Sequence, residues 1–260
     1  MGPKKKAKKG DGDGDESTEK VFRLYKRKCA EEGIPVVKRL EEKFLELREE
    51  ELDLTHLHVI DEIGDVGTRA ILDAMRDVDY QHCTAVSFLK TNCQDEGCRA
   101  IVQFLEKVHT VTILEVEESQ LTPLSCEFIS RILIPDSLCP LQELKLDHNM
   151  LGAAGVEALA VGLRANSTLK RLSLAYCGIE EDAAFGLINI LTTKFTAITH
   201  LILQGNRLRN TGIKQILPMF KLNESLTHLN LADNDFGQDK EAVAVLCDTM
   251  MARDKIDSYD

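Results

Sequence analysis

The sequence predicts an α/β solenoid, a right-handed horseshoe arc of about seven repeats of 28–30 residues. One observation is a recurring pair of leucines two residues apart, and a period of about 20–50 residues is typical of solenoids. A second is a change of rhythm within each unit, from the two-residue period of a strand to the three-and-four period of a helix. The first leucines of the four clearest pairs follow one another at spacings of 28, 29 and 28 residues: Leu144, Leu172, Leu201 and Leu229.

The first 16 residues are expected to form a disordered tail, basic at its start and acidic after it. The acidic run DGDGDESTE matches the first three ligand positions of a calcium-binding loop, but Glu16 stands where that loop needs glycine and Phe22 where it needs glutamate. We therefore interpret the acidic run as a flexible linker. The basic part is expected to contact an acidic surface, tubulin being one possibility, through Lys4, Lys5, Lys6, Lys8 and Lys9.

Residues 17–50 are expected to form a helical cap. The sequence GIP at 33–35 separates two stripes of apolar residues with helical spacing, and Pro35 is well placed to open the second helix. The first repeat of a solenoid has an exposed apolar end that must be covered. The two stripes are therefore predicted to lie against that end: Val21, Phe22, Tyr25 and Cys29, then Val36, Val37, Leu40, Phe44 and Leu47.

Residues 51–260 are assigned to the repeat domain. Weaker copies of the strand pair precede the four clear ones, at Leu57 and Val59, Val86 and Phe88, and Leu114 and Val116. A turn slot follows each strand, and an asparagine there can bond backbone groups that the turn leaves unpaired. The slot holds Asn149, Asn206 and Asn234 in three copies, and Thr91, Ser119 and Cys177 in three others.

The strand pair followed by Asn149 or Asn206, then Leu151 or Leu208, then a glycine resembles the ribonuclease-inhibitor-like subfamily of leucine-rich repeats. The resemblance covers residues 55 to 250 and implies parallel strands on the inside of the arc with helices on the outside. It describes packing, and function must be argued from the exposed residues.

A second resemblance concerns the segment FRLYKRKCAEEGIPVVKRL, which is similar to the segment that precedes the repeats in ciliary and centrosomal leucine-rich repeat proteins. It depends on Tyr25, Cys29, Gly33 and Pro35 and their spacing. A lysine-rich start such as MGPKKKAKKG also resembles that of many axonemal proteins. These resemblances imply a cytoplasmic protein of the cilium or flagellum axoneme.

The residues between and after the strand leucines are expected to point to the concave face, where a partner protein would bind. They grade from an acidic end to a mixed middle that contains Tyr176 and Ile202, and aromatic or aliphatic residues in a polar field are typical anchors of interfaces. The candidate partner-binding residues are Glu115, Glu117, Glu118, Glu143, Lys145, Asp147, His148, Arg171, Tyr176, His200, Ile202, Gln204, His228, Asn230 and Asp233.

Charge and composition narrow the class of partner. Because five lysines in the first ten residues add +5 to a net charge of −11, the other 250 residues carry −16. Such a body repels nucleic acid and favours basic partners.

The N-terminus lacks the apolar core of a secretory signal, and no apolar stretch reaches the length of a membrane span. The eight cysteines show no paired zinc spacing, and free thiols indicate a reducing compartment.

The sequence offers no arrangement of nucleophile, base and acid for catalysis and no phosphate-binding glycine loop. His200 and His228 hold equivalent slots in adjacent repeats, but without a third metal ligand we expect them to be surface residues. We therefore predict a non-catalytic protein–protein interaction scaffold, without cofactor or metal, in a larger ciliary assembly. Two alternatives remain: a regulator of a GTPase or other enzyme, since Ran GTPase-activating proteins and ribonuclease inhibitor have similar repeats, and a nuclear acidic chaperone of basic proteins.

Overall fold

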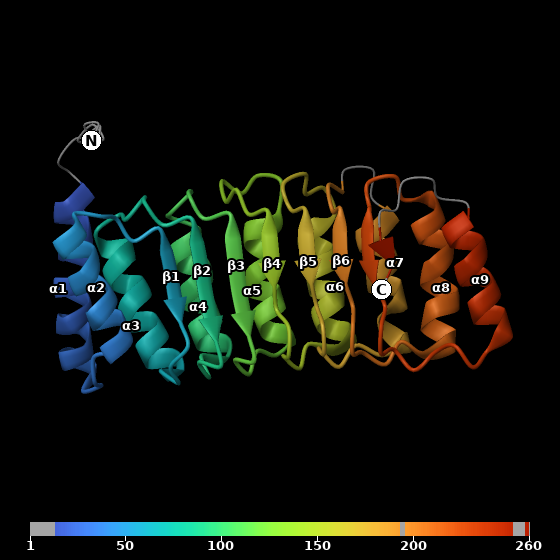
Figure 1. Cartoon of the computed structure of the whole chain (residues 1–260), viewed down its shortest axis with the longest axis horizontal. Helices are drawn as coiled ribbons and strands as arrows, with labels where there is room; N and C mark the ends of the chain where they lie inside the picture. The colour runs from blue at the N-terminus through green and yellow to red at the C-terminus, as the bar shows by residue number, and fades with distance from the viewer. Residues whose placement is uncertain (1–13, 193–195, 252–257, 260) are drawn as a thin grey trace, which may run out of the picture.

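A computed structural model describes residues 14–192, 196–251 and 258–259. Strands and helices alternate along the chain and form two layers, with one parallel sheet on one side and the helices on the other (Figure 1). The strands lie in chain order in the sheet: β1 (His56–Val59), β2 (Ala85–Leu89), β3 (Ile113–Glu117), β4 (Glu143–Lys145), β5 (Arg171–Ser173), β6 (His200–Ile202), β7 (His228–Asn230) and β8 (Ser258–Tyr259).

The helices of the repeats each follow a strand and return the chain to the start of the next one. Their bounds are α3 (Gly64–Asp77), α4 (Gln94–Leu105), α5 (Pro123–Leu133), α6 (Gly152–Leu163), the 3-10 helix η1 (Glu181–Ala183) with α7 (Ala184–Thr192), α8 (Arg209–Leu222) and α9 (Lys240–Met251). Within the described ranges, no helix is both long and apolar enough to cross a membrane.

The register of the sheet confirms the predicted repeat. The first residues of the strand pairs face one another across the whole sheet, in the order Leu57, Val86, Leu114, Leu144, Leu172, Leu201 and Leu229. All seven are buried, and they join one apolar core that runs through every repeat. The seven repeats supply β1 to β7 as predicted, and the two-residue β8 near the C-terminus, which belongs to no repeat, adds to the edge of β7.

Asparagines in the turn slot satisfy the backbone as expected. The side-chain Oδ1 of Asn149 accepts hydrogen bonds from the backbone N–H groups of Ser119 (3.1 Å) and Leu121 (3.0 Å) in the preceding repeat. Its Nδ2 donates to the carbonyl oxygens of Val116 and Leu146, at 2.7 and 2.8 Å. Each asparagine therefore ties the turn of its own repeat to that of its neighbour.

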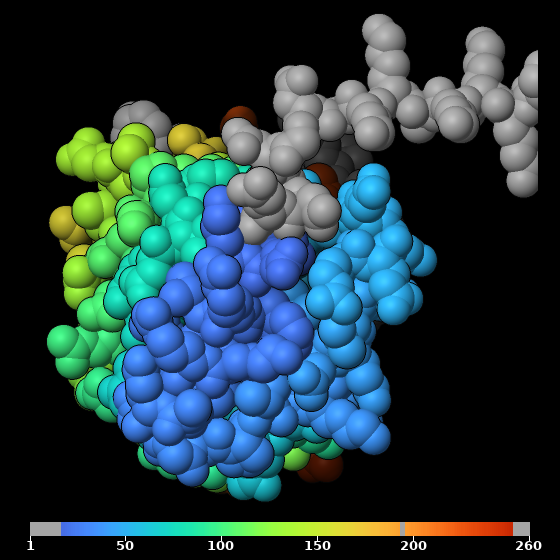
Figure 2. Space-filling model, turned by 90° about the vertical axis from the view of Figure 1, so that its left-hand side faces the viewer, coloured from blue at the N-terminus to red at the C-terminus, as the bar shows by residue number. Residues whose placement is uncertain are grey.

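Two helices cover the N-terminal end of the solenoid, α1 (Gly14–Glu32) and α2 (Lys38–Glu50). Viewed from that end, they occupy most of the surface (Figure 2). The rings of Phe22 and Phe44 stack at 5.0 Å between centroids and join the two helices. The hydroxyl of Tyr25 accepts a hydrogen bond from the backbone N–H of Val37 at 3.2 Å, which holds the turn between them.

The boundary of the expected N-terminal tail needs a correction. Residues 14–16 were expected to belong to a disordered tail, but they form the first turn of α1. Acidic residues near a helix N-terminus are favoured by the helix dipole, which explains why this acidic run continues into a helix. Residues 1–13, with the lysines expected to contact a partner, lie outside the described residues.

Candidate functional site

The face of the sheet that points away from the helices, here named the concave face, carries rows of side chains with one member per repeat. Successive strand residues point to opposite faces, so these rows alternate with the buried leucine rows. The first row is His56, Ala85, Ile113, Glu143, Arg171, His200 and His228, and the second is His58, Ser87, Glu115, Lys145, Ser173, Ile202 and Asn230. The structure thus brings the predicted strand residues together on one surface.

A ladder of ion pairs crosses β3, β4 and β5 on this face. The Lys145 Nζ lies 2.5 Å from the Glu115 Oε1 and 3.3 Å from the Glu143 Oε1, and the Arg171 Nε lies 3.5 Å from that same Glu143 oxygen. Burial alone would raise the pKa of Glu115, but hydrogen bonds from Lys145 and Ser87 and the charge of Lys145 hold it below its usual value. The ladder therefore keeps Glu115 ionised.

Glu117 is the acid that the ladder does not neutralise. It is half-buried, and within the described chain its carboxylate has neither an ion pair nor a hydrogen bond. Burial first, and then the negative charges of Asp147 and Glu115, raise its pKa above the usual glutamate value. A cation brought by another molecule would relieve this repulsion.

Asp147 is held by the chain itself. Its Oδ2 accepts a hydrogen bond from the Ser173 hydroxyl and its Oδ1 accepts one from the Ala175 backbone N–H, both at 2.8 Å. The carboxylate therefore joins two repeats and cannot turn toward a partner without losing these bonds. Its neighbour Glu118 is exposed and makes a surface ion pair with Lys90 at 3.2 Å.

The turn after each strand places a side chain at the edge of the concave face. Glu118, His148, Tyr176 and Asp233 occupy this slot with φ of 46°, 58°, 55° and 55°, in the left-handed region. The rings of His148 and Tyr176 stack at 4.7 Å with an interplanar angle of 6°. The Tyr176 ring also covers Gly205, where an added Cβ would lie only 2.1 Å from its Cε1. Tyr176 is thus a positioned aromatic surface, 39 % exposed.

His200 and His228 stack as their equivalent slots predict, with 4.0 Å between ring centroids. Each Nδ1 lies 2.8 Å from the hydroxyl of the preceding threonine, Thr199 or Thr227. Those hydroxyls donate their hydrogens to backbone carbonyls, so each Nδ1 is the donor in its own pair. No group of three or more histidine, cysteine or acidic residues that could hold a metal occurs in the described part of the chain.

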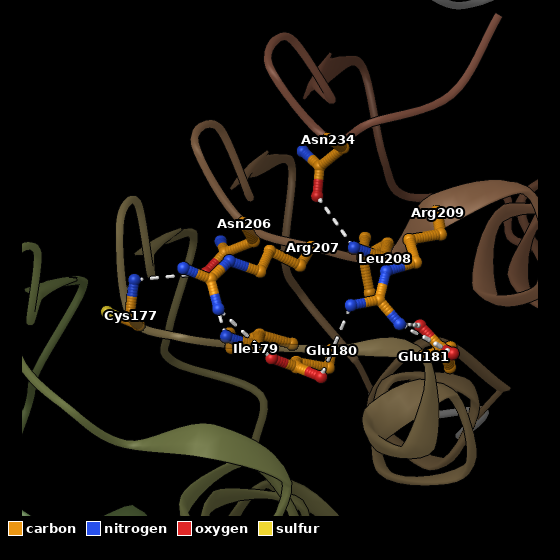
Figure 3. A network of polar contacts seen from close by, with 9 residues as sticks. All are labelled: Cys177, Ile179, Glu180, Glu181, Asn206, Arg207, Leu208, Arg209 and Asn234. Carbon is orange, nitrogen blue, oxygen red and sulfur yellow. Dashed lines mark hydrogen bonds and ion pairs between the residues drawn. The ribbon is translucent and has the colours of Figure 1, made fainter. Parts of the chain in front are cut away.

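Arginines beside the C-terminal end of β6 are engaged in an internal network. Figure 3 shows Arg207 and Arg209 directed at the acids of the preceding repeat. The Arg207 Nη1 lies 3.4 Å from the Glu180 Oε1, and the Arg209 Nη1 lies 3.0 Å from both carboxylate oxygens of Glu181. These exposed pairs hold both guanidinium groups along the turn edge, so neither projects freely toward another protein.

A chain of polar groups on β1, β2 and β3 was not found from the sequence. The His56 Nε2 lies 2.8 Å from the Ser87 hydroxyl, which donates to the Glu115 Oε2 at 2.7 Å. Because the hydroxyl hydrogen goes to Glu115, the imidazole must be the donor to Ser87. The serine is fully buried, so this chain links strands and presents no nucleophile. Extending the list of concave residues to the first two repeats would have revealed it.

The cysteines are likewise placed for packing. Seven of the eight are buried and none is in a disulfide, while Cys247 is exposed. Burial raises the pKa of the thiols, which keeps them protonated and unreactive at neutral pH. The raised pKa is about 11 for Cys83, Cys93 and Cys139 and about 12 for Cys177.

Comparison with known proteins agrees with this architecture. A family model described as a leucine-rich repeat matches residues 137–160, 165–187 and 222–239. Ribonuclease inhibitor from Sus scrofa is 26 % identical over 193 residues, covering 74 % of this chain and 41 % of that protein. Ribonuclease inhibitor from Mus musculus is 32 % identical over 126 residues, covering 48 % of this chain and 25 % of that protein. The chain therefore spans less than half the length of these relatives.

A solved structure described as leiomodin-1 actin-binding site 2 is also similar to the chain. It has a TM-score of 0.43 and 15 % sequence identity, and the match covers 70 % of this chain and 86 % of that one. At this level the likeness has no bearing on which partner the chain binds.

Proposed function

Because the chain is a leucine-rich repeat protein that resembles ribonuclease inhibitors, we propose that it is a non-catalytic scaffold whose concave face binds a basic segment of another protein. The observation that carries this proposal is Glu117, a half-buried acid whose pKa is raised by burial and by Asp147 and Glu115. A lysine or arginine of a partner would neutralise it in a partly desolvated setting, where a charge pair contributes more than at an open surface.

The geometry of the face suggests the spacing of the partner's contacts. Glu117 ends β3, whereas Tyr176 lies in the turn after β5, so across the sheet two strand spacings of about 4.8 Å separate them, or roughly 10 Å. One helix heptad rises about 10.5 Å, since each helical residue rises about 1.5 Å. A partner helix with a basic residue and an apolar residue seven positions apart would reach both Glu117 and the Tyr176 ring.

Charge reversal of Glu117 and Glu118 to lysine tests the proposal. Glu115 is left unchanged because reversing it would break its internal pair with Lys145. We expect the variant to retain at least fivefold less partner in pull-downs from ciliated-cell extracts, and added salt should reduce binding to the parent protein similarly. The matched control reverses Glu49 and Glu50, exposed acids at the end of α2. If the parent, the Glu117 and Glu118 variant and the Glu49 and Glu50 control retain equal amounts of partner, the interface does not lie on the concave face.

The aromatic contact can be tested independently of charge. Tyr176→Ala should weaken partner retention severalfold, because exposed tyrosines in a polar surround often dominate binding energy. Phe185→Ala is the control, since Phe185 is an exposed aromatic on α7, in the helical layer. If the two alanine variants lose partner equally, the proposed anchor is wrong.

We further propose that the scaffold works in a ciliary or flagellar axonemal complex, with its lysine tail on an acidic surface such as that of tubulin. Support comes from the resemblance at Tyr25, Cys29, Gly33 and Pro35. Tyr25 and Cys29 are buried in the cap, so their pattern also serves folding. Imaging of the tagged full chain tests the location: an axonemal signal supports the proposal, whereas a purely nuclear signal favours the acidic chaperone of basic proteins.

Regulation of an enzyme is the second candidate function, favoured by the similarity to ribonuclease inhibitor. Arg207 and Arg209 are paired with Glu180 and Glu181, so these two residues are poor candidates for an arginine supplied to a GTPase. Adding the purified chain to ribonuclease A and to a Ran-type GTPase distinguishes these options. Inhibition of the first or stimulation of the second would favour the regulator.

A further inference from the structure

The N-terminal edge of the sheet has a groove that none of the preceding functions uses. It lies between α2 and β1, has a volume of about 660 Å³, and is lined by residues of both elements and of the segment that joins them. This volume is within the range of about 300–1,000 Å³ that is typical of ligand clefts. The cap therefore covers the end of the helical layer but leaves a recess beside the first strand.

The outer edge of β1 presents backbone groups to this groove. The Ala85 N–H donates to the Thr55 carbonyl, so the odd-numbered residues of β1 direct their backbone groups toward β2. His56 and His58 therefore direct their N–H and C=O groups to the other side. Within the described chain no hydrogen bond is formed by these outward groups. An open strand edge of this kind is a template for another strand.

Apolar side chains flank the open edge. Leu52 is 49 % exposed and Ile60 is 43 % exposed, one on each side of the strand along the chain, and both line the groove. The α2 side contributes Leu40 and Leu47. An extended segment would place alternate side chains against these residues and the others toward solvent.

The charges around the groove select an acidic occupant. Arg39 lines it and has no ion pair within the described chain, and Lys43 is paired only with the exposed Glu46 of its own helix. The acid in the lining, Asp53, accepts a hydrogen bond from Thr18 and lies 3.4 Å from the His82 Nδ1, so it is already engaged. The rim is thus positive on a chain whose net charge is −11.

We propose that this groove binds an extended segment of a partner protein, with alternating apolar and acidic residues, which adds to the outer edge of β1 as an extra strand. Main-chain hydrogen bonds to His56 and His58 would supply affinity, while Leu52, Ile60 and Arg39 would select side chains. A helix cannot take this place, because its backbone groups are already bonded within it. The occupant is acidic, so it differs from the basic segment proposed for the concave face.

Selection from a displayed library of random twelve-residue peptides, with the full chain as the target, tests this proposal. The selected peptides should alternate apolar with aspartate or glutamate, and their affinity is then measured by fluorescence anisotropy with synthetic copies. Arg39→Glu should weaken binding about tenfold. Lys38→Glu, the matched control at the adjacent position outside the groove lining, should change it less than twofold.

Two further measurements address the backbone. His58→Pro removes an N–H that serves only the groove, so it should abolish peptide binding while the urea midpoint of unfolding stays close to that of the parent. Methylation of alternate backbone nitrogens in the peptide should also abolish binding. Equal binding by the methylated peptide, or basic peptides emerging from the selection, would overturn the proposal.

Two other outcomes would assign the groove differently. If Arg39→Glu leaves the affinity for these acidic peptides unchanged while the reversal of Glu117 and Glu118 to lysine raises it, they bind the concave face and the edge-strand proposal fails. If the chain self-associates in sedimentation and Arg39→Glu abolishes that association, the occupant is a second copy and the proposal of a partner segment is wrong.

Discussion

Replacing Asn149 by alanine should destabilise the solenoid strongly, because this one side chain holds the turns of two repeats together. Its amide group makes five hydrogen bonds, two accepted from backbone N–H groups and three donated to carbonyl oxygens, over distances of 2.7 to 3.2 Å. The side chain is 1 % exposed, so water cannot replace it without opening the turn. Alanine keeps the backbone and removes every one of these bonds.

The magnitude follows from the groups left unpaired. The N–H groups of Ser119 and Leu121 lose their partner, and a buried unsatisfied group costs about 1–3 kcal/mol. Two such donors account for about 2–6 kcal/mol. The carbonyl of Leu146 keeps a weak bond from the Cys177 thiol at 3.2 Å, so the carbonyl side adds less. We expect a loss of about 4 kcal/mol in the free energy of unfolding.

Urea unfolding followed by circular dichroism measures this loss, with the midpoint and slope fitted separately because a repeat protein can unfold in parts. Asn189→Ala is the control, since Asn189 is half-buried on α7 and its side chain makes no hydrogen bond within the described chain. It should cost less than about 0.5 kcal/mol. If Asn149→Ala destabilises by no more than about 1 kcal/mol beyond this control, the amide network is not what stabilises the turn.

Three further predictions concern the core, the cap and the concave face. Leu146→Asp places a charge at a fully buried position and should cost about 4 kcal/mol or more, measured by urea unfolding; a parental melting curve would contradict the register. Deleting residues 1–50 should uncover the apolar side of α3 and cause aggregation in light scattering, whereas deleting 1–13 should not. Glu117→Gln should stabilise the fold at pH 7 by up to about 1 kcal/mol, because the raised pKa of Glu117 means that its ionised form is disfavoured in the folded state. The gain should shrink as pH falls toward 4.5, the ordinary glutamate pKa, since the parent carboxyl then takes up a proton.

The fold was predictable because every repeat carries the same sequence pattern. The leucine pair and the asparagine slot recur with the period of the solenoid, so Leu144 and Asn149 can be assigned from spacing alone and their partners follow. The two-residue strand β8 carries no such pattern, and it depends only on the open edge of β7. Likewise, α1 begins at Gly14, within an acidic run. This start could not be read from the apolar stripe, because the stripe begins only at Val21.

The members of the candidate surface were predictable, but their pairings were not. Strand alternation places Glu115, Lys145 and Glu117 on the concave face. Which acid Lys145 reaches depends on side-chain length and on the offset between adjacent strands. Only the structure shows that it pairs with Glu115 and Glu143, while the Glu117 carboxylate has no ion pair or hydrogen bond among the described residues. The stacked pair of His148 and Tyr176 also depends on the left-handed turn conformation that both residues adopt.

The uncompensated charge of Glu117 separates a binding role from a packing role by the sign of two measurements. If Glu117 served the fold, replacing it by glutamine would lower stability, as the loss of the Glu115 pair with Lys145 should. If it serves a partner, the same replacement removes repulsion from Asp147 and Glu115 in the free protein and removes the attraction for a cation in the complex. Stability should then rise while affinity falls. A binding role for Glu117 therefore requires that its replacement raises stability and lowers affinity. Replacement of Glu115, which the fold uses in its pair with Lys145, should lower both stability and affinity.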